Sequence, residues 1–271
     1  MREPNQYKYV EEYLDQLRSQ GRYSFTSSDL KEKFNLSDEA VLKALQRIKR
    51  KRKAAMVRQE FYVIIPPEYS SRGMLPPTLF VADLMNFLQK DYYVGLLNAA
   101  VYYGASHQQP QEFYIVTTKP TLRPIKSRQL KINFCYKKQL SHADIIERKV
   151  ETGFFRISSP ELTALDIVFF FDRVGGFNRV ITVLEELVSS IDAMKLAETA
   201  RRFSQTAAVQ RLGFLLDVVL NQQELIKPMK EVLTNVKHFP VLLRPQKEKP
   251  ASMRTDNFWK VVRNIEIESE A

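Results

Sequence analysis

Residues 37–65 read SDEAVLKALQRIKRKRKAAMVRQEFYVII, and this stretch decides the fold of the N-terminal part of the chain. Ser37 is a good N-cap for a helix that follows it. The apolar side chains of that helix are predicted to form one stripe, made of Val41, Leu42, Leu45 and Ile48. A basic run at 49–53 follows, and the β-rich segments 55–57 and 61–65 are joined around 58–60. The stretch therefore predicts a helix, a basic turn and a two-stranded hairpin.

Two shorter predicted helices precede this stretch. Apolar residues recur at helical spacing between 7 and 20, and Gly21 ends the pattern as a glycine at C′ does. Thr26 and Asp29 resemble a capping box, and the short helix that they begin stops near Asn35. Three helices followed by a hairpin are the element order of a winged helix-turn-helix.

A break rich in proline separates this part from the rest of the chain. Pro66 and Pro67 end the periodicity, and the stretch 70–77 adds a glycine and two more prolines. We therefore place a winged helix-turn-helix domain at 1–68, a linker at 69–77 and a C-terminal domain at 78–271.

The C-terminal domain is predicted to mix helices and strands. Its first half has helices at 78–89 and 93–103 and strands at 113–117, 130–134 and 154–157. Ser159 and Pro160 begin a helical half, with further helices at 177–190, 192–203, 207–220 and 223–232 and a last strand within 258–265. The predicted fold class is α+β: a winged helix-turn-helix and a mixed α/β domain with a small sheet and a helical half.

The charge balance favours an anionic partner. The chain has 41 Lys and Arg against 31 Asp and Glu, for a formal net charge of +10. Nucleic acid is the first candidate, because phosphate neutralisation drives its binding. A solubilising surface or an acidic protein partner would give the same balance.

The sequence favours a cytoplasmic protein. The most apolar stretch, 167–171, is too short to span a bilayer, and the chain begins without an apolar signal region. The single cysteine, Cys135, cannot form an internal disulfide.

The basic face of the third helix is the best candidate for DNA binding. In a helix-turn-helix, the N-terminal residues of the second helix of the motif lie closest to base edges, and its flanks contact phosphate. Base contacts are expected from Ser37, Asp38 and Lys43, and groove or backbone contacts from the basic residues that follow. The full predicted set is Thr26, Ser27, Ser37, Asp38, Lys43, Arg47, Arg50, Lys51, Lys53 and Arg58. The alternative is a solvated helix end, where cations favour the helix dipole.

A second basic group lies in the strand region, with no acidic residue between Lys119 and Lys138. We call it the basic C-terminal surface and define it by Lys119, Arg123, Lys126, Arg128 and Lys131. It is expected to bind nucleic acid or an acidic protein, with Phe134 and Tyr136 available for stacking on RNA bases. Edge protection of an exposed strand is the alternative.

Features of catalysis are scarce in the sequence. His107, His142 and His238 lack metal-ligand spacing, and there is no nucleophile elbow, P-loop or dinucleotide fingerprint. Glu161, Asp166 and Asp172 could be imagined as paired catalytic carboxylates. Glu161 is better explained as an acid in the first turn of a helix. We therefore expect no catalytic residue, metal or cofactor, and no enzyme activity.

Three segments of the C-terminal domain resemble the AbiEi family of antitoxins from type IV toxin–antitoxin systems. The first is YYVGLLNAA at 92–100, followed by Gly104, Ala105, His107 and Gln108. The second is SPELTALD at 159–166. The third is Gly175-Gly176 with Arg179-Val180 and VLEEL at 183–187. Their order after a winged helix is more specific than any one segment, although Tyr102-Tyr103 stands where the family more often has Leu-His.

The resemblance implies an antitoxin of an abortive infection system for phage defence. Its N-terminal domain would bind operator DNA and repress a two-gene operon, and its C-terminal domain would oppose a nucleotidyltransferase-like toxin, with or without direct contact. Two alternatives stay open: a stand-alone winged-helix regulator whose C-terminal domain senses a ligand or oligomerises, and a nucleic-acid-processing enzyme. One winged helix covers a short site, so we expect cooperative binding to repeated half-sites.

Overall fold

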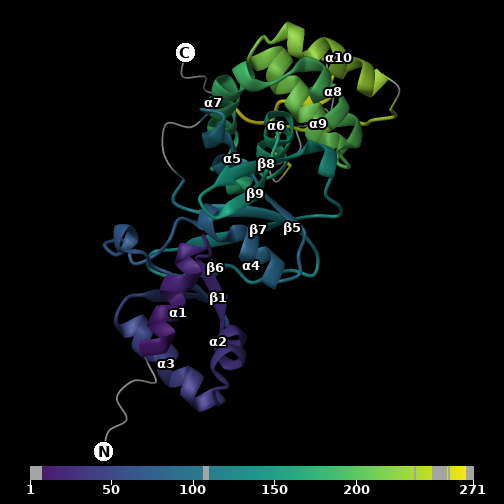
Figure 1. Cartoon of the computed structure of the whole chain (residues 1–271). Helices are drawn as coiled ribbons and strands as arrows, with labels where there is room; N and C mark the ends of the chain where they lie inside the picture. Colours follow the sequence, from purple (N-terminus) through teal and green to yellow (C-terminus); the bar gives the residue numbers. More distant parts are fainter. Residues whose placement is uncertain (1–7, 106–109, 235, 246–254, 256, 267–271) are drawn as a thin grey trace, which may run out of the picture. The chain divides into compact units, whose positions relative to one another are not determined.

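The structure is a computed structural model that describes residues 8–105, 110–234, 236–245, 255 and 257–266 (Figure 1). It combines helices and strands, which confirms the predicted α+β class. The chain forms two compact units. The first contains Met1–Tyr92, Ile115–Leu140 and Glu147–Arg156, and the second contains Tyr93–Tyr114, Ser141–Ile146 and Ile157–Ala271. The domain boundaries expected from the sequence, 1–68 and 78–271, stay a prediction.

The N-terminal part of the first unit has the predicted three helices and hairpin. They are α1 (Lys8–Ser19), α2 (Ser27–Phe34), α3 (Asp38–Arg50), β2 (Ala54–Arg58) and β3 (Phe61–Ile64). The sequence analysis missed β1 (Ser24–Thr26), which pairs antiparallel with β3 in a sheet of order β1-β3-β2. With only three residues, β1 is too short to show a strand pattern.

The predicted helix caps are confirmed. The Thr26 hydroxyl accepts from Asp29 N–H at 3.1 Å, and the Asp29 carboxylate accepts from Thr26 N–H at 2.8 Å, so α2 begins with a true capping box. The Ser37 hydroxyl accepts from Ala40 N–H at 3.3 Å and caps α3. Asn35 ends α2 in a left-handed conformation, with φ of 49°.

One core cluster fixes the orientation of α3. Its members come from the three helices and the hairpin: Val10, Leu14, Leu17, Phe25, Leu30, Val41, Ala44, Leu45, Ile48, Ala54, Tyr62 and Ile64. Leu42, which was predicted to share this stripe, is 56% exposed. Because each residue turns a helix by about 100°, Ala44 completes the stripe with Val41, and Leu42 lies on the polar side.

A six-stranded sheet has the order β6-β7-β5-β4-β9-β8. Its strands are β4 (Tyr92–Val94), β5 (Phe113–Thr118), β6 (Ile125–Lys126), β7 (Lys131–Lys137), β8 (Ile145–Val150) and β9 (Gly153–Ser158). β4 pairs parallel with β9, with Val94 opposite Ile157, and β6 pairs antiparallel with β7. β8, an edge strand, was missed from the sequence because three charged residues in a row, at 147–149, interrupt its apolar residues.

The helix predicted at 93–103 is wrong at its start. Tyr93 and Val94 belong to β4 and are fully buried, and α5 (Leu96–Tyr102) begins only after Gly95. A short apolar run that is buried on all sides has no period that distinguishes a strand from a helix. The helix predicted at 78–89 is found as α4 (Val81–Phe87), preceded by the 3₁₀ turn Pro77–Leu79.

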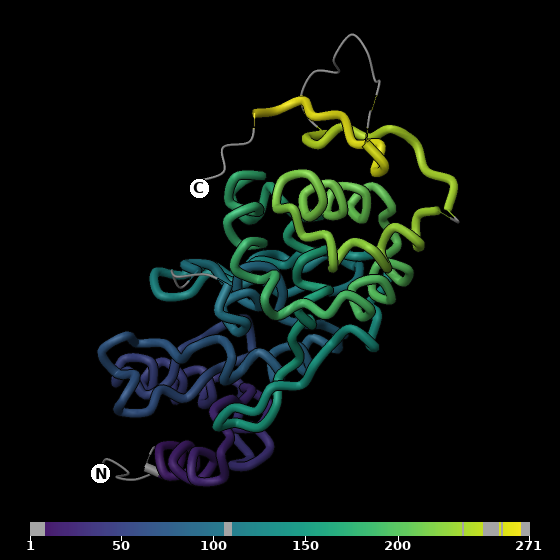
Figure 2. Tube along the Cα trace, turned by 90° about the horizontal axis from the view of Figure 1, so that it is seen from above, coloured from purple at the N-terminus to yellow at the C-terminus, as the bar shows by residue number. Residues whose placement is uncertain are grey.

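The helical half of the second unit is confirmed. It contains α6 (Pro160–Phe169), α7 (Phe177–Leu187), α8 (Ala193–Arg202), α9 (Thr206–Phe214) with the π-helical segment Leu215–Val219, and α10 (Gln223–Thr234). Further 3₁₀ turns lie at Pro67–Tyr69, His142–Asp144, Phe171–Arg173 and Val188–Ser190. Figure 2 shows these helices in green, with the yellow C-terminal segment beside them at the upper edge.

The strand predicted within 258–265 is reduced to β11 (Val261–Val262), which pairs parallel with β10 (Val241–Leu242). Buried Trp259 anchors this segment, since its indole N–H donates to the Asp217 carboxylate at 2.9 Å. A Cβ at Gly213 would lie 2.1 Å from the Trp259 ring, so α9 needs glycine at this point.

Among the residues that the structure places, no helix is long and apolar enough to cross a membrane.

Candidate nucleic-acid interface

The first two turns of α3 and its N-cap present the residues predicted to read bases. Ser37, Asp38 and Lys43 are all exposed. The Asp38 carboxylate accepts from Lys31 Nζ at 2.6 Å, and Lys43 Nζ lies 2.6 Å from the Glu39 carboxylate one turn earlier. The hydrogen bond and the charge of Lys43 lower the pKa of Glu39. Exposed pairs of this kind contribute little stability, so a ligand can displace them at little cost.

Sequence reasoning missed Leu42 as a surface residue of α3. Its side chain lies on the same side of the helix as Lys43 and Gln46, which are also exposed. The signal was present, because Ala44 at the neighbouring position fits the apolar stripe better. An exposed apolar side chain on a helix of this kind suits contact with the methyl group of thymine.

Thr26 and Ser27 lie half-buried at the start of α2, and the hydroxyl of Thr26 is occupied by the capping box. Arg47 is half-buried and Arg50 exposed on the last turns of α3. The structure therefore brings the predicted DNA-binding residues of α2 and α3 to one small domain, with exposure greatest on α3.

Lys51 and Lys53, predicted to hold phosphate, share one carboxylate in the structure. Lys51 Nζ lies 2.5 Å from Glu11 Oε1, and Lys53 Nζ lies 2.5 Å from Glu11 Oε2. The hydrogen bonds from Lys51 and then Lys53 hold the pKa of Glu11 below its ordinary value, against the opposite effect of burial. Glu11 belongs to α1, 40 residues before Lys51, and no local pattern pointed to it.

Arg58, predicted to be a wing residue, is half-buried at the end of β2. Its Nη1 donates to the Arg123 carbonyl at 3.5 Å, the outer limit of a hydrogen bond. The wing therefore contacts the loop that carries part of the basic C-terminal surface, within the same unit.

All five residues of the basic C-terminal surface are exposed, on and around the hairpin of β6 and β7. Arg128 lines a hollow of about 620 Å³ together with Lys49, Arg52 and Arg72. The residues that line this hollow include no carboxylate. Four cations without an acid on the same wall make a site suited to phosphate.

Phe134 is only 5% exposed, so its ring is not available for the predicted stacking of RNA bases. The Tyr136 hydroxyl donates to the Leu122 carbonyl at 2.8 Å and accepts from Leu122 N–H, so this residue holds the loop before β6. Its ring is half-buried, and stacking on it stays a prediction.

The carboxylates of the second unit are used for structure. Asp166 Oδ2 accepts from the Tyr93 hydroxyl at 2.7 Å, and Glu161 Oε1 accepts from Asp192 N–H at 3.0 Å. Asp172 is exposed in a separate 3₁₀ turn. Glu161 lies in the first turn of α6, as expected.

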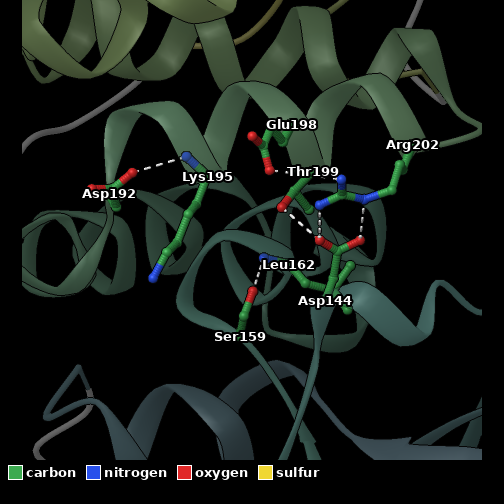
Figure 3. Close-up of polar contacts among 8 residues, drawn as sticks. All are labelled: Asp144, Ser159, Leu162, Asp192, Lys195, Glu198, Thr199 and Arg202. Carbon is green, nitrogen blue, oxygen red and sulfur yellow. Dashed lines mark hydrogen bonds and ion pairs between the residues drawn. The ribbon is translucent and has the colours of Figure 1, made fainter.

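Asp144 is the centre of a buried polar cluster (Figure 3). Its carboxylate accepts from Arg202 Nη2 at 2.6 Å and Nε at 3.2 Å, and from the Thr199 hydroxyl at 2.8 Å. Burial raises the pKa of Asp144, but hydrogen bonds from Arg202, Ser141 and Thr199 outweigh it, so the pKa lies below its ordinary value. The cluster ties the segment before β8 to α8.

No group of three or more metal-ligating side chains was found within the described parts of the chain. His107 and Gln108, which the family resemblance includes, lie outside those parts.

A stretch of the chain that includes parts of both units matches a known family. Residues 93–218 match the family model of the AbiEi antitoxin C-terminal domain. The chain carries an AbiEi antitoxin domain. This domain begins within β4 and ends within the π-helical segment after α9, and it includes the segments at 159–166 and 175–187 on which the resemblance was based. The resemblance predicted from the sequence is therefore confirmed for this part, and the family model does not extend to the winged helix.

A solved structure shares the fold. The crystal structure of RV2827C protein from Mycobacterium tuberculosis has a TM-score of 0.65 and 16% sequence identity, and the match covers 94% of this chain and 90% of that one. An antigenic nucleotidyltransferase-like protein from Paracoccidioides brasiliensis has a TM-score of 0.34 and 11% identity, over 55% of this chain and 88% of that one. No curated protein sequence matches the chain.

Proposed function

We propose that this protein is the antitoxin of a type IV toxin–antitoxin system and that it also binds its own operator DNA and represses its operon. The AbiEi domain at 93–218 supports the antitoxin role. The observation that carries the DNA-binding role is the exposed polar side of α3, whose C-terminal end leads to a hollow lined by four cations and no carboxylate.

In this proposal α3 reads the major groove. Lys43 donates to guanine, Asp38 accepts from cytosine, and Leu42 contacts thymine methyl groups. Arg47 and Arg50 continue along the groove, and the wing adds Lys53 and Arg58 to the backbone contacts. The four cations of the hollow, Lys49, Arg52, Arg72 and Arg128, neutralise phosphates beside the wing.

The antitoxin domain is proposed to oppose a nucleotidyltransferase-like toxin in the cytoplasm, as part of phage defence by abortive infection. It acts without catalysis of its own, since its buried carboxylates Asp144, Glu161 and Asp166 are held by hydrogen bonds within the domain. The basic C-terminal surface serves DNA binding through Arg128, and its other residues are open to the toxin or to a shared target.

The experiment is a binding titration at controlled salt against DNA from the protein's own promoter. We compare the wild type with a variant that combines Lys43→Ala and Arg47→Ala, and with one that combines Lys126→Ala and Arg128→Ala. We expect a large loss of promoter binding in the first variant and a smaller loss in the second. Rescue of toxin-inhibited growth should survive in the first variant.

A wild type that binds its own promoter no better than unrelated DNA would contradict the proposed repression. In that case the winged helix would belong to a regulator of other genes, and growth rescue alone would decide the antitoxin role. Cooperative binding is tested by comparing one half-site with two: equal affinity for both would contradict it.

A further inference from the structure

Glu11 holds both lysines that lie between α3 and the wing. Each of its carboxylate oxygens is 2.5 Å from a different Nζ, of Lys51 and of Lys53. The side chain of Glu11 is 19% exposed, whereas those of Lys51 and Lys53 are 51% and 45% exposed. The lysines can therefore be reached by an incoming anion while Glu11 binds them.

Lys51 and Lys53 lie at the junction between α3 and the wing. Lys51 ends α3 as its C-cap residue, and Lys53 directly precedes β2, the first strand of the wing. In a winged helix bound to DNA, this junction flanks the groove-reading helix and lies where backbone phosphates pass. The three charged groups line one open hollow of about 610 Å³, together with Asp15, Arg18 and Arg52.

We propose that Glu11 is a positioning residue that limits the affinity of the winged helix for DNA, because it occupies Lys51 and Lys53 in place of backbone phosphates. This inference rests on the proposed DNA binding. Glu11 lies on α1, which does not itself read DNA in the proposed function.

The physical reason is competition between two anions for the same ammonium groups. A cation that neutralises a phosphate releases counterions from DNA, and the slope of log affinity against log salt steepens by about 0.9 for each such phosphate. Two lysines alone carry a charge of +2, whereas two lysines with one glutamate carry +1. The junction therefore adds less to the DNA affinity of the wild type than Lys51 and Lys53 would add without Glu11.

The pair formed by Lys43 and Glu39 does not have this property. It joins neighbouring turns of one helix by a single contact, and the Glu39 side chain is 76% exposed. Water and phosphate displace such a pair easily. Glu11 differs because it comes from α1, makes two contacts and has a side chain that is only 19% exposed.

The experiment measures binding to promoter DNA over a fourfold range of salt for the wild type and Glu11→Gln. We expect Glu11→Gln to bind roughly 12-fold more tightly at the lowest salt, a gain that shrinks towards none at the highest salt, because two lysines become free for phosphate. Between the lowest and the highest salt, the affinity of Glu11→Gln should fall up to about 12-fold more than that of the wild type. The reason is that its plot of log affinity against log salt is steeper by about 1.8. A purely structural role of Glu11 would not change this slope.

The matched control is Glu12→Gln, the same change of charge on the adjacent exposed residue of α1. It should leave the salt slope unchanged. A triple variant with Glu11→Gln, Lys51→Ala and Lys53→Ala should lose the gain in affinity. If Glu11→Gln failed to fold, as judged by its thermal melt, Glu11→Asp would replace it, because a side chain shorter by one methylene cannot reach both lysines.

Each of two results would refute a different claim. If the wild type prefers its promoter and Glu11→Gln binds like Glu12→Gln or more weakly, the role of Glu11 is refuted while the proposed function stands. If the wild type has no preference for its promoter, the proposed function itself fails.

Discussion

The winged helix and the antitoxin domain use paired charges in opposite ways. At the winged helix, Lys51 and Lys53 remain about half exposed while they contact Glu11. In the antitoxin domain, Asp144 is 3% exposed and receives three hydrogen bonds from Arg202 and Thr199. A half-exposed lysine can exchange a carboxylate for a phosphate once that contact is broken, whereas a buried carboxylate that loses its donors is left unsolvated. The comparison teaches that the paired lysines of one region stay accessible to a ligand, whereas the paired carboxylate of the other serves architecture.

Among the variants of polar contacts, the largest effect is expected from Asp144→Ala. This change removes the acceptor for Arg202 and Thr199 inside the domain, and we expect the free energy of unfolding to fall by about 3 kcal/mol. Urea denaturation measures it, with exposed Asp172→Ala as the control, for which we expect a change below about 0.5 kcal/mol. Equal stability of the two variants would remove the contrast between the two regions.

Tyr93→Phe is expected to have the next largest effect. The hydroxyl of Tyr93 donates to the carboxylate of Asp166, and both side chains are fully buried. Loss of one hydrogen bond to a buried charged group should lower the free energy of unfolding by about 2 kcal/mol. Tyr102→Phe, on an exposed ring, is the control. A change below about 0.5 kcal/mol for Tyr93→Phe would show that the buried carboxylate does not depend on this donor.

The pH dependence of stability sharpens the comparison further. The folded-state pKa of Asp144 lies below its ordinary value of 3.8, so its contribution is complete above that value and is lost as the pH falls through the folded pKa. The stability of the wild type should therefore fall more steeply than that of Asp144→Asn when the pH is lowered from about 5 towards 3. Thermal melts at several pH values measure this difference. Parallel curves would mean that Asp144 has no depressed pKa.

The smallest effect on stability is expected at the winged helix surface. Leu42→Ala should change the free energy of unfolding by less than about 0.5 kcal/mol, because the side chain is 56% exposed. Leu45→Ala, in the core only three residues away, should cost about 2–5 kcal/mol. Leu42→Ala should nevertheless weaken promoter binding severalfold in the titration. Unchanged DNA affinity would assign Leu42 no part in the interface.

Local signals in the sequence predicted much of the secondary structure. Thr26, Ser37 and Ser159 were recognised as helix caps, and each accepts the backbone hydrogen bond that defines a cap. These predictions succeeded because a cap involves residues only three positions apart. The strand β4 was missed because its burial depends on neighbours far along the chain, such as Ile157 opposite Val94.

The candidate interface was predicted less completely. The charge run at 49–53 and the basic C-terminal surface were visible as composition, but the sequence did not show that Arg128 lines the same hollow as Lys49 and Arg52. Phe134 illustrates the opposite error, since an aromatic residue between lysines suggested stacking and proved to be buried.

The sequence by itself determined the helix caps, the apolar stripe of α3, the α+β class and the antitoxin domain, because each is encoded in short patterns of neighbouring residues. The tertiary structure decided which charges are free for a ligand. Glu11 reaches Lys51 and Lys53 across about 40 residues of sequence, and Asp144 reaches Arg202 across 58. Electrostatic interactions depend on distance in space and on exposure to water, and both of these are set by the packing of elements that are far apart in the chain.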